Sequence, residues 1–199
     1  MREFWEQRYS EEEYAYGTEP NAFLVAAADR LAPGSKALMV GDGQGRNGVW
    51  LAEQGLRVTS VDFARAGLER TQELARQRGV SVETQHEDLL HWDWPKAAFD
   101  AVVAIFVHFG PENRARVHRE MINSVKPGGW IILEGFEKSQ LGRDSGGPPV
   151  EELLYTEHDL AEDFADTEIE LLETREVELD EGRYHRGKAM VVRLVARKG

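Results

Sequence analysis

Short apolar blocks and amphipathic stretches alternate along most of this chain. The first block, residues 36–41, ends in glycine, and the helical pattern that follows it stops at Gly55. The same alternation continues to residue 135. Strands are expected at residues 57–61, 80–85, 100–106 and 130–135, and helices at residues 20–31, 64–78 and 111–125. This order predicts a mostly parallel sheet with helices on both faces.

The pattern changes after residue 135. Residues 136–156 begin with a cluster of Gly, Ser and Pro without periodicity, and we expect a mobile connection there. A helix is expected at 157–164, followed by strands at 168–179 and 188–196. A short link joins these two strands, so they are expected to pair antiparallel and close a seven-stranded sheet. The predicted fold class is α/β, a Rossmann-like three-layer sandwich.

The chain length of 199 residues fits one domain. Within residues 1–199 we expect a helical cap or lid at 1–31 and a cofactor-binding core at 36–135. The mobile connection at 136–156 then leads to a C-terminal helix and strand pair at 157–199. We interpret the acidic run at 151–181 as a solvated face.

Composition and charge disfavour several classes of function. The formal net charge of −12 would repel a nucleic-acid backbone, and no Lys- or Arg-rich stripe opposes it. The hydrophobic content is 41%, but no apolar run is long enough to cross a membrane. The absence of cysteine and the polar start MREFWEQRY favour a cytoplasmic protein without disulfides. His86, His91 and His108 fall on different elements, so no metal site is predicted.

A glycine-rich turn follows the first expected strand. Gly41, Gly43 and Gly45 stand where backbone must approach a ligand closely and a side chain would obstruct it. Two motifs fit this turn. These glycines match the GxGxG of adenosylmethionine sites, while Gly43, Gly45 and Gly48 match the dinucleotide GxGxxG. A merely tight turn is the third interpretation. The flanking strand and helix favour a cofactor site.

Asp62 ends the second expected strand and follows Gly41 by 21 residues. This is near the spacing at which a carboxylate reaches the ribose hydroxyls of an adenosine, which both cofactor classes contain. The alternative is a solvated aspartate that caps the helix beginning at Ala64. Asp62 therefore supports a cofactor site without choosing between the two classes.

Later landmarks separate the two cofactor classes. Asp88 follows the third expected strand, where its carboxylate and a neighbouring amide can bind an adenine edge, and residues 126–129 turn tightly into the fifth strand. With these landmarks in order, residues 37–133 resemble the class I S-adenosylmethionine-dependent methyltransferases. The resemblance implies S-adenosyl-L-methionine as cofactor, with the glycine turn against its methionine part, Asp62 on its ribose and Asp88 on its adenine. The cofactor-binding residues expected on this basis are Gly41, Asp42, Gly43, Gly45, Arg46, Asn47, Asp62, Phe63, Asp88, Leu89 and Ile105.

Asp42 departs from the family pattern, which often has cysteine or another small residue there. A carboxylate at this point would repel a pyrophosphate but suits a sulfonium and an amino group, which favours methyl transfer over hydride transfer. Within the family, the chain is most similar to the small tellurite-resistance-like and thiopurine-like methyltransferases. That similarity rests on Phe4-Trp5 to Tyr9, Tyr16-Gly17, Gly45-Arg46-Asn47, Ile105 to His108, and Tyr184 to Gly187.

Methyl transfer from a sulfonium is a direct displacement, so holding the acceptor in line and excluding water are the main tasks. For an anionic acceptor a cationic side chain is wanted, and His185 and Arg186 are the candidates. For a neutral acceptor a base helps, and His108 or His185 are the candidates. The alternatives are a packing role for His108 and a solvated loop that contains His185 and Arg186.

Aromatic residues near the start of the chain form a candidate lid. Trp5, Tyr9 and Tyr16 can cover a sulfonium, because aromatic faces attract cations, or they can staple the first core helix. Phe106, at the end of the fourth strand, is expected at the substrate site. The predicted function is methyl transfer to a small-molecule acceptor by a monomer or homodimer. Two alternatives stay open: a non-catalytic module that binds adenosylmethionine or adenosylhomocysteine, and a nicotinamide-dependent oxidoreductase, which the absence of a Tyr-x-x-x-Lys motif disfavours.

Overall fold

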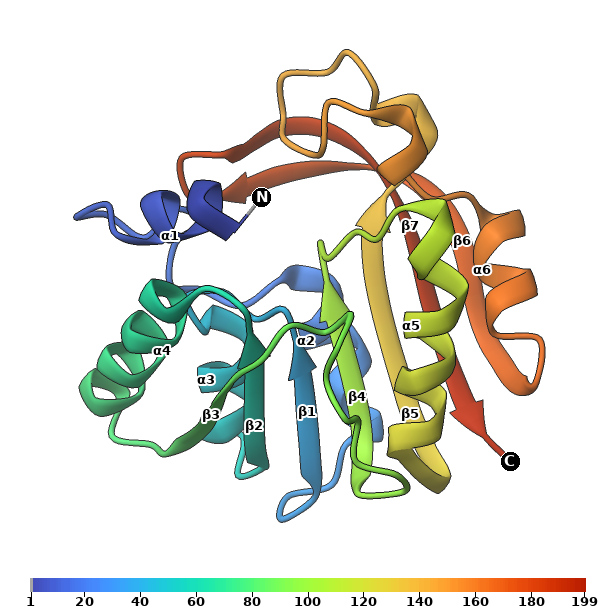
Figure 1. Cartoon of the computed structure of the whole chain (residues 1–199), viewed down its shortest axis with the longest axis horizontal. Coiled ribbons are helices and arrows are strands. Elements are labelled where there is room, and N and C mark those ends of the chain that lie inside the picture. Colours follow the sequence, from blue (N-terminus) through green and yellow to red (C-terminus); the bar gives the residue numbers. More distant parts are fainter. Residues whose placement is uncertain (1) are drawn as a thin grey trace.

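The computed structural model describes residues 2–199, which form one seven-stranded sheet with helices on both faces (Figure 1). The strand order is β3-β2-β1-β4-β5-β7-β6, with parallel pairing from β3 through β5 and antiparallel pairing of β7 with β5 and β6. The predicted fold class is confirmed.

The strands are β1 (Lys36–Val40), β2 (Arg57–Asp62), β3 (Val82–His86), β4 (Phe99–Ile105), β5 (Val125–Phe136), β6 (Thr167–Glu181) and β7 (His185–Lys198). The helices are α1 (Arg2–Tyr9), α2 (Ala22–Ala27), α3 (Arg46–Glu53), α4 (Arg65–Arg78), α5 (Pro111–Ser124) and α6 (Glu157–Asp163), with 3-10 turns η1 (Ala28–Arg30), η2 (Lys138–Gln140) and η3 (Glu151–Leu153).

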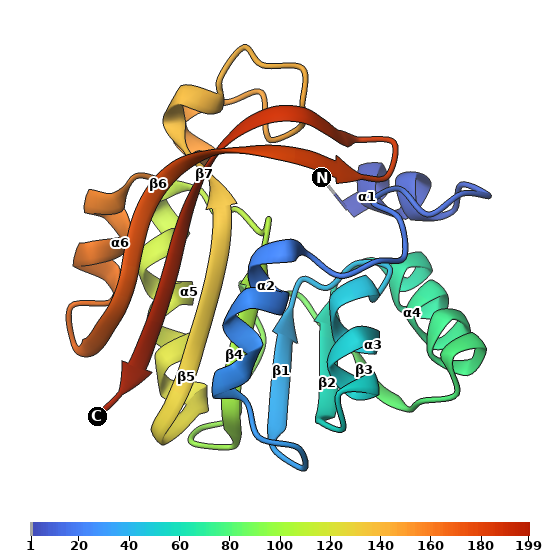
Figure 2. The same cartoon turned by 180° about the vertical axis from the view of Figure 1, so that it is seen from behind.

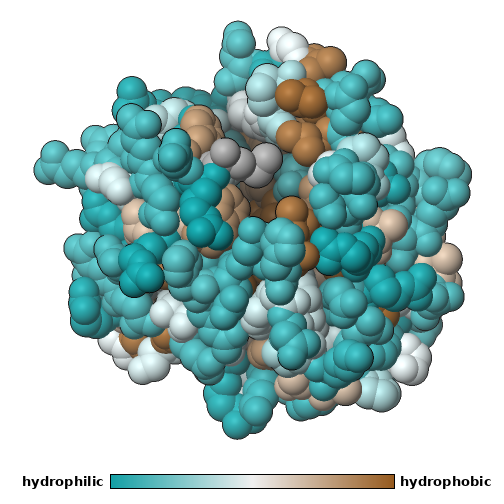
Figure 3. Space-filling view, in the orientation of Figure 1, coloured by the Kyte–Doolittle hydropathy of each residue, from teal (hydrophilic) through white to brown (hydrophobic). Residues whose placement is uncertain are grey.

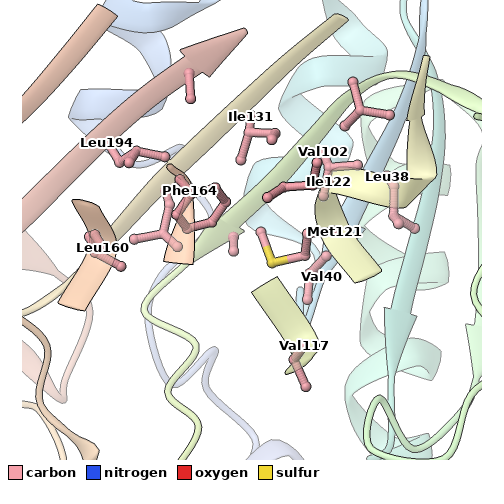
Figure 4. Packing of buried hydrophobic residues seen from close by; sticks show 14 of the residues in the cluster. Leu38, Val40, Val102, Val117, Met121, Ile122, Ile131, Leu160, Phe164 and Leu194 are labelled. Atoms are coloured by element: carbon pink, nitrogen blue, oxygen red, sulfur yellow. The ribbon is translucent and has the colours of Figure 1, made fainter. Parts of the chain in front are cut away.

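Two hydrophobic cores lie on opposite faces of the sheet, because side chains alternate along each strand. In β1, Leu38 and Val40 face the core built with α5 and α6, which Figure 4 shows. Ala37 and Met39 face the other core, built with α2, α3 and α4. Central strands that are covered on both faces are mostly apolar, and β1 and β4 carry charged side chains only near their first residues, at Lys36 and Asp100.

The β6–β7 hairpin bends over the carboxyl edge of the parallel strands (Figure 2). Its tip contacts the chain that follows α1, where the backbone nitrogen of Arg183 donates to the carbonyl oxygen of Ala15 at 3.1 Å. Its outer half has a small core of its own. The hairpin therefore covers the edge at which open α/β sheets bind ligands. The small core contains Phe136, Leu154, Leu179, Ala189 and Val191.

Most element bounds lie within a few residues of the predicted ones. The helix expected at 20–31 is shorter, because α2 ends at Ala27 and a 3-10 turn follows, and its cap is Asn21, whose side chain accepts from the backbone nitrogen of Leu24 at 3.0 Å. The link between the last two strands shrinks to residues 182–184, since pairing extends to the ends of both strands. His185 and Arg186 thus belong to a strand rather than to a loop, which corrects the sequence interpretation.

Residues 136–156 pack beside the hairpin. The backbone nitrogen of Tyr155 donates to the carbonyl oxygen of Phe136 at 3.0 Å, and the side-chain oxygen of Gln140 accepts from the backbone nitrogen of Met190 at 2.7 Å. The mobility expected of this segment stays a prediction. None of the helices within residues 2–199 combines the length and the apolar character needed to cross a membrane.

Candidate functional site

The carboxyl ends of β1, β2 and β4 meet at one edge of the sheet, because their register aligns the last residues of the three strands. The glycine turn leaves β1 at this edge. Gly41, Gly43 and Gly45 have φ angles of 61°, 58° and 83°. Residues with a side chain rarely adopt such angles, so the path of the turn requires glycine.

Neighbouring side chains also cover the turn closely. A Cβ on Gly41 would lie 2.8 Å from the side chain of Val107, which follows β4. A Cβ on Gly43 would lie 2.6 Å from the hydroxyl of Tyr9 in α1. The turn between β1 and α3 therefore runs through a space too narrow for side chains at Gly41 and Gly43.

Asp62 lies at the end of β2, directly beside the glycine turn. One of its carboxylate oxygens accepts from the backbone nitrogen of Gly43 at 2.9 Å, and the other from that of Ala64 at 2.8 Å. Burial raises its pKa to about 6, although both hydrogen bonds lower it. Asp62 is buried, so it is more than the solvated cap considered from the sequence. It joins the glycine turn to the start of α4.

Asp42 points away from the turn and into the protein. Its Oδ2 accepts from the hydroxyl of Ser60 at 2.6 Å, and the carboxylate lies beside the backbone of Gly48 in α3. Its Oδ1 has no hydrogen-bond partner within residues 2–199. Burial raises the pKa of this carboxyl to about 6. The side chain of Asp42 thus lies beneath the turn, and a contact of this residue with the cofactor stays a prediction.

Arg46 and Asn47 belong to a buried polar network. Nη2 of Arg46 donates to Oε2 of Glu181 at 2.8 Å, and these side chains are 8% and 11% exposed. The side-chain oxygen of Asn47 accepts from the backbone nitrogen of Asn21 at 2.8 Å. Asn21 donates in turn to the carboxylates of Glu134 and Glu181, at 2.7 and 3.0 Å. Both side chains hold α3 against α2 and the hairpin, and contacts of Arg46 and Asn47 with the cofactor stay predictions.

Residues after β2 and β3 share this edge with the glycine turn. The carboxylate of Asp88 lies 4.0 Å from the guanidinium of Arg2 in α1, and this guanidinium also lies 5.9 Å from the ring centroid of Phe63. Leu89 and Ile105 are buried in the two cores. The structure thus brings Asp88 and Phe63 together under α1, whereas Leu89 and Ile105 offer backbone and apolar surface only.

Helix α1 lies across the edge (Figure 1). The carboxylate of Glu6 accepts from two backbone nitrogens at the start of α4, at 2.8 and 2.9 Å. Trp5 stacks on Tyr9 with ring centroids 5.3 Å apart, and the ring of Tyr16 lies 6.4 Å from that of Trp5. This cluster packs over the glycine turn and α4. Its position is that of a cover and not that of a staple on the first core helix.

His108 is held as a neutral packing residue. Its Nδ1 donates to the carbonyl oxygen of Leu153 at 2.7 Å, and its Nε2 accepts from the backbone nitrogen of Phe136 at 3.1 Å. Burial lowers its pKa to about 4. Both ring nitrogens are engaged, so no lone pair is left to take a proton from an acceptor. The prediction of His108 as a general base is therefore wrong, and its packing alternative describes the structure.

His185 and Arg186 point to opposite faces of β7, as neighbours on a strand do. His185 is 6% exposed, and its ring centroid lies 4.3 Å from that of Tyr16 and 4.7 Å from that of Phe106. The side chain of Arg186 is 72% exposed and lies 3.5 Å from the carboxylate of Asp180. The prediction that Arg186 binds an acceptor is corrected, because strand alternation directs it to solvent.

Phe106 follows β4 with a φ of 55°, a strained conformation for a bulky residue. Its ring stacks on that of Phe136 at a centroid distance of 4.5 Å. Figure 3 shows a small apolar recess on this face of the molecule, which is otherwise largely hydrophilic. A bulky residue held at a positive φ is typical of functional sites.

Glu181 and Tyr155 were missed by the sequence reasoning. Glu181 belongs to the acidic run interpreted as a solvated face, yet it is buried against Arg46. The hydroxyl of Tyr155 accepts from the backbone nitrogen of Phe109 at 2.8 Å and donates to the carbonyl oxygen of Val107 at 3.2 Å, so it fixes the chain after β4. No local signal marks either residue as buried, since Arg46 and Asn21, which bond Glu181, and Val107 and Phe109, which bond Tyr155, are distant in sequence. No cluster of potential metal ligands was found among residues 2–199.

A family model and several known proteins match part of this chain. Residues 37–129 match a family model described as a methyltransferase domain. A Mycobacterium tuberculosis protein, Uncharacterized protein Rv1405c, is 34% identical over 119 residues, which cover 57% of this chain and 43% of that protein. The phosphatidylethanolamine N-methyltransferase of Cereibacter sphaeroides is 30% identical over 122 residues, which cover 60% of this chain and 58% of that protein. The chain spans about half the length of these relatives.

Solved structures show the same fold. TehB from Haemophilus influenzae matches with a TM-score of 0.74 at 20% identity, over 100% of this chain and 67% of that structure. The matched domain contains the glycine turn, Asp62 and Asp88, which occupy one edge of the sheet. Residues 37–129 are therefore similar to a methyltransferase domain, and the chain has the fold of solved S-adenosylmethionine-dependent methyltransferases.

Proposed function

We propose that this chain transfers a methyl group from S-adenosyl-L-methionine to a small-molecule acceptor. The observation that carries the proposal is the bond between Asp62 and the glycine turn, with the carboxylate 2.9 Å from the nitrogen of Gly43 at the ligand-binding edge of the sheet. A second carboxylate, Asp42, lies beneath the same turn. The two carboxylates place negative charge beside and beneath the glycine turn. Such charge disfavours a pyrophosphate and suits a positively charged sulfonium.

The residues present fit the cofactor in its three parts. The backbone of Gly41–Gly45 would lie against the methionine part, and Asp62 would bind the ribose hydroxyls. Asp88, with the backbone of Leu89, would bind the adenine. The aromatic residues of α1 would cover the bound molecule, because this helix crosses the same edge.

When bound, the cofactor supplies a methyl group that is activated by a positively charged sulfur. The chain must then hold the acceptor in line and exclude water. Phe106 and Phe136 offer a stacked aromatic wall at the end of β4. The hairpin and α1 cover this place from two sides (Figure 2).

Calorimetric titration of the purified protein with adenosylmethionine, adenosylhomocysteine and NADH tests the proposal. We expect adenosylmethionine to bind with a Kd of micromolar order. Asp62→Asn should weaken this binding by about tenfold or more, because a charged hydrogen-bond acceptor is lost. The matched control is Asp93→Asn, which changes an exposed aspartate and should bind like the wild type.

Binding of NADH without adenosylmethionine would replace the proposal with the oxidoreductase alternative. Binding of adenosylmethionine with no methylation of thiols, hydroxyl compounds or amines would favour the binding-only module. A location in the cytoplasm, a monomeric or homodimeric state and the absence of nucleic-acid substrates stay predictions from the sequence.

A further inference from the structure

One buried histidine beside the proposed acceptor site has an unused ring nitrogen. Nδ1 of His185 lies 3.4 Å from Oε2 of Glu181, but Nε2 forms no hydrogen bond to any group within residues 2–199. A Cβ on Gly146 would lie only 3.3 Å from Nε2. The backbone of Gly146 therefore packs close to this edge of the ring, and only glycine fits there, but it forms no hydrogen bond with Nε2.

Glu181 is held in place as a charged carboxylate. It accepts from Arg46 at 2.8 Å and from Asn21 at 3.0 Å. Burial opposes its charge, but the hydrogen bond with His185 and the charge of Arg46 lower its pKa to about 2. A carboxylate bonded to Nδ1–H selects the histidine tautomer whose lone pair is on Nε2.

The ring of His185 lies at the proposed acceptor site. Its centroid is 4.7 Å from that of Phe106, which directly follows β4. The next residue, Val107, packs against Gly41 of the glycine turn. The histidine is therefore close to the edge where the cofactor is proposed to bind, on the side of the hairpin.

Charged groups face His185 from several elements, namely Glu181 of β6, Arg46 of α3, Arg8 of α1 and His108 after β4. Arg46 is paired with Glu181, Arg8 donates to a tyrosine hydroxyl at 3.1 Å, and His108 is kept neutral by burial. Burial also lowers the pKa of His185, so its imidazole is neutral near pH 7 and able to accept a proton.

The chemistry of the acceptor follows from this arrangement. An anionic acceptor needs no base and gains from a free cation, whereas the cations that face His185 are already engaged. A neutral amine has a lone pair ready for attack. A neutral hydroxyl is the acceptor that depends most on a base, because its proton must leave as the new bond forms. The rings of Tyr16, Phe106 and Phe136 around His185 favour a planar aromatic compound.

We propose that His185, oriented by Glu181, is the general base and that the acceptor is a neutral aromatic compound with a hydroxyl group. This inference rests on the proposed function. Nε2 takes the hydroxyl proton while the acceptor oxygen bonds the methyl carbon; the carbon–sulfur bond breaks, and its electron pair stays on the sulfur. Glu181 is a positioning residue that stabilises the imidazolium until solvent removes the proton.

Nitrogen-15 NMR of the histidine side chains, recorded without cofactor, tests the interaction of His185 with Glu181 without measuring activity. In the wild type near pH 7 we expect a proton on Nδ1 of His185 and none on Nε2. Glu181→Gln should lower the pKa of His185 and weaken this preference, while Asp180→Asn, at an exposed neighbouring position, should change neither. A proton on Nε2 in the wild type would overturn the proposal.

Methyl transfer to 4-methylphenol and to 4-methylbenzenethiol tests the base directly, because the thiol is largely ionised near neutral pH and needs no base. His185→Phe keeps an aromatic ring among Tyr16 and Phe106, so it serves even if Glu181→Gln fails to fold. It should lower the ratio of kcat for the phenol to kcat for the thiol by about 10²–10⁴-fold and leave the Kd of adenosylmethionine unchanged.

Each outcome separates the inference from the proposed function. An unchanged ratio of the two kcat values in His185→Phe, or methylation of the thiol but not of the phenol, would overturn the inference and leave the methyltransferase assignment standing. Binding of adenosylmethionine without any methylation of the phenol would also count against the acceptor class. A protein that does not bind adenosylmethionine would remove the proposed function itself.

Discussion

Acidification is expected to destabilise this protein through His108, and replacing this residue should remove that sensitivity. Burial lowers the pKa of His108 to about 4 in the folded chain, compared with 6.5 for an ordinary histidine. Between these two pH values the unfolded chain binds a proton that the folded chain does not. The free energy of unfolding therefore falls as the pH falls through this window.

The structure sets the size of the effect. The two pKa values correspond to a loss of about 2 kcal/mol between pH 8 and pH 5 from His108 alone. Asp42 and Asp62 act in the opposite direction, because a pKa raised to about 6 makes the folded chain bind protons before the unfolded chain does. A comparison of the wild type with a His108 variant cancels the contribution of both carboxyls.

His108→Gln cannot titrate and keeps one of the two hydrogen bonds of the imidazole. At pH 8 it should be less stable than the wild type by about 1–2 kcal/mol, and by pH 5 this deficit should have shrunk by about 2 kcal/mol. Urea unfolding followed by tryptophan fluorescence measures both free energies. His158→Gln, which changes an exposed histidine, is the control and should show no such convergence. A deficit of His108→Gln that stays constant between the two pH values would refute the claim that burial keeps this histidine neutral.

Further outcomes are expected from other parts of the structure. Arg46→Met leaves a buried carboxylate without its cation and should lower the free energy of unfolding by about 3–5 kcal/mol in urea titrations, whereas Arg186→Met, on the exposed face, should change it by less than about 0.5 kcal/mol. Equal effects would contradict the burial of the first pair. Gly43→Ala places a methyl group 2.6 Å from a tyrosine hydroxyl and should abolish adenosylmethionine binding in calorimetry, while Gly79→Ala, with a positive φ but open space, should cost about 1–2 kcal/mol of stability and leave binding intact. Tyr155→Phe leaves a buried backbone nitrogen without an acceptor and should lower the free energy of unfolding by about 1–3 kcal/mol; an unchanged urea midpoint would show that its hydroxyl is dispensable.

The fold could be predicted from the sequence because its signals are local. Alternation along a strand and the helical repeat are set by backbone geometry within a few residues, so the order of strands and helices was readable before any contact was known. The glycine turn and Asp62 were readable for the same reason. Parallel strands bring their carboxyl ends to one edge, and a glycine with positive φ is a requirement of the turn itself.

The tertiary structure alone decided which side chains share a site. Asn21 and Glu134 are 113 residues apart and bond at 2.7 Å, and no spacing in the sequence marks such a pair. Hairpin pairing turned a predicted loop into strand, which sent His185 inward and Arg186 to solvent. His108 and His185 are alike in sequence as candidate bases. They differ in the structure, because Phe136 and Leu153 occupy both nitrogens of the first, whereas Glu181 orients the second and leaves one nitrogen free. The direction of a side chain and its hydrogen-bond partners depend on how distant segments pack, and the local sequence does not determine them.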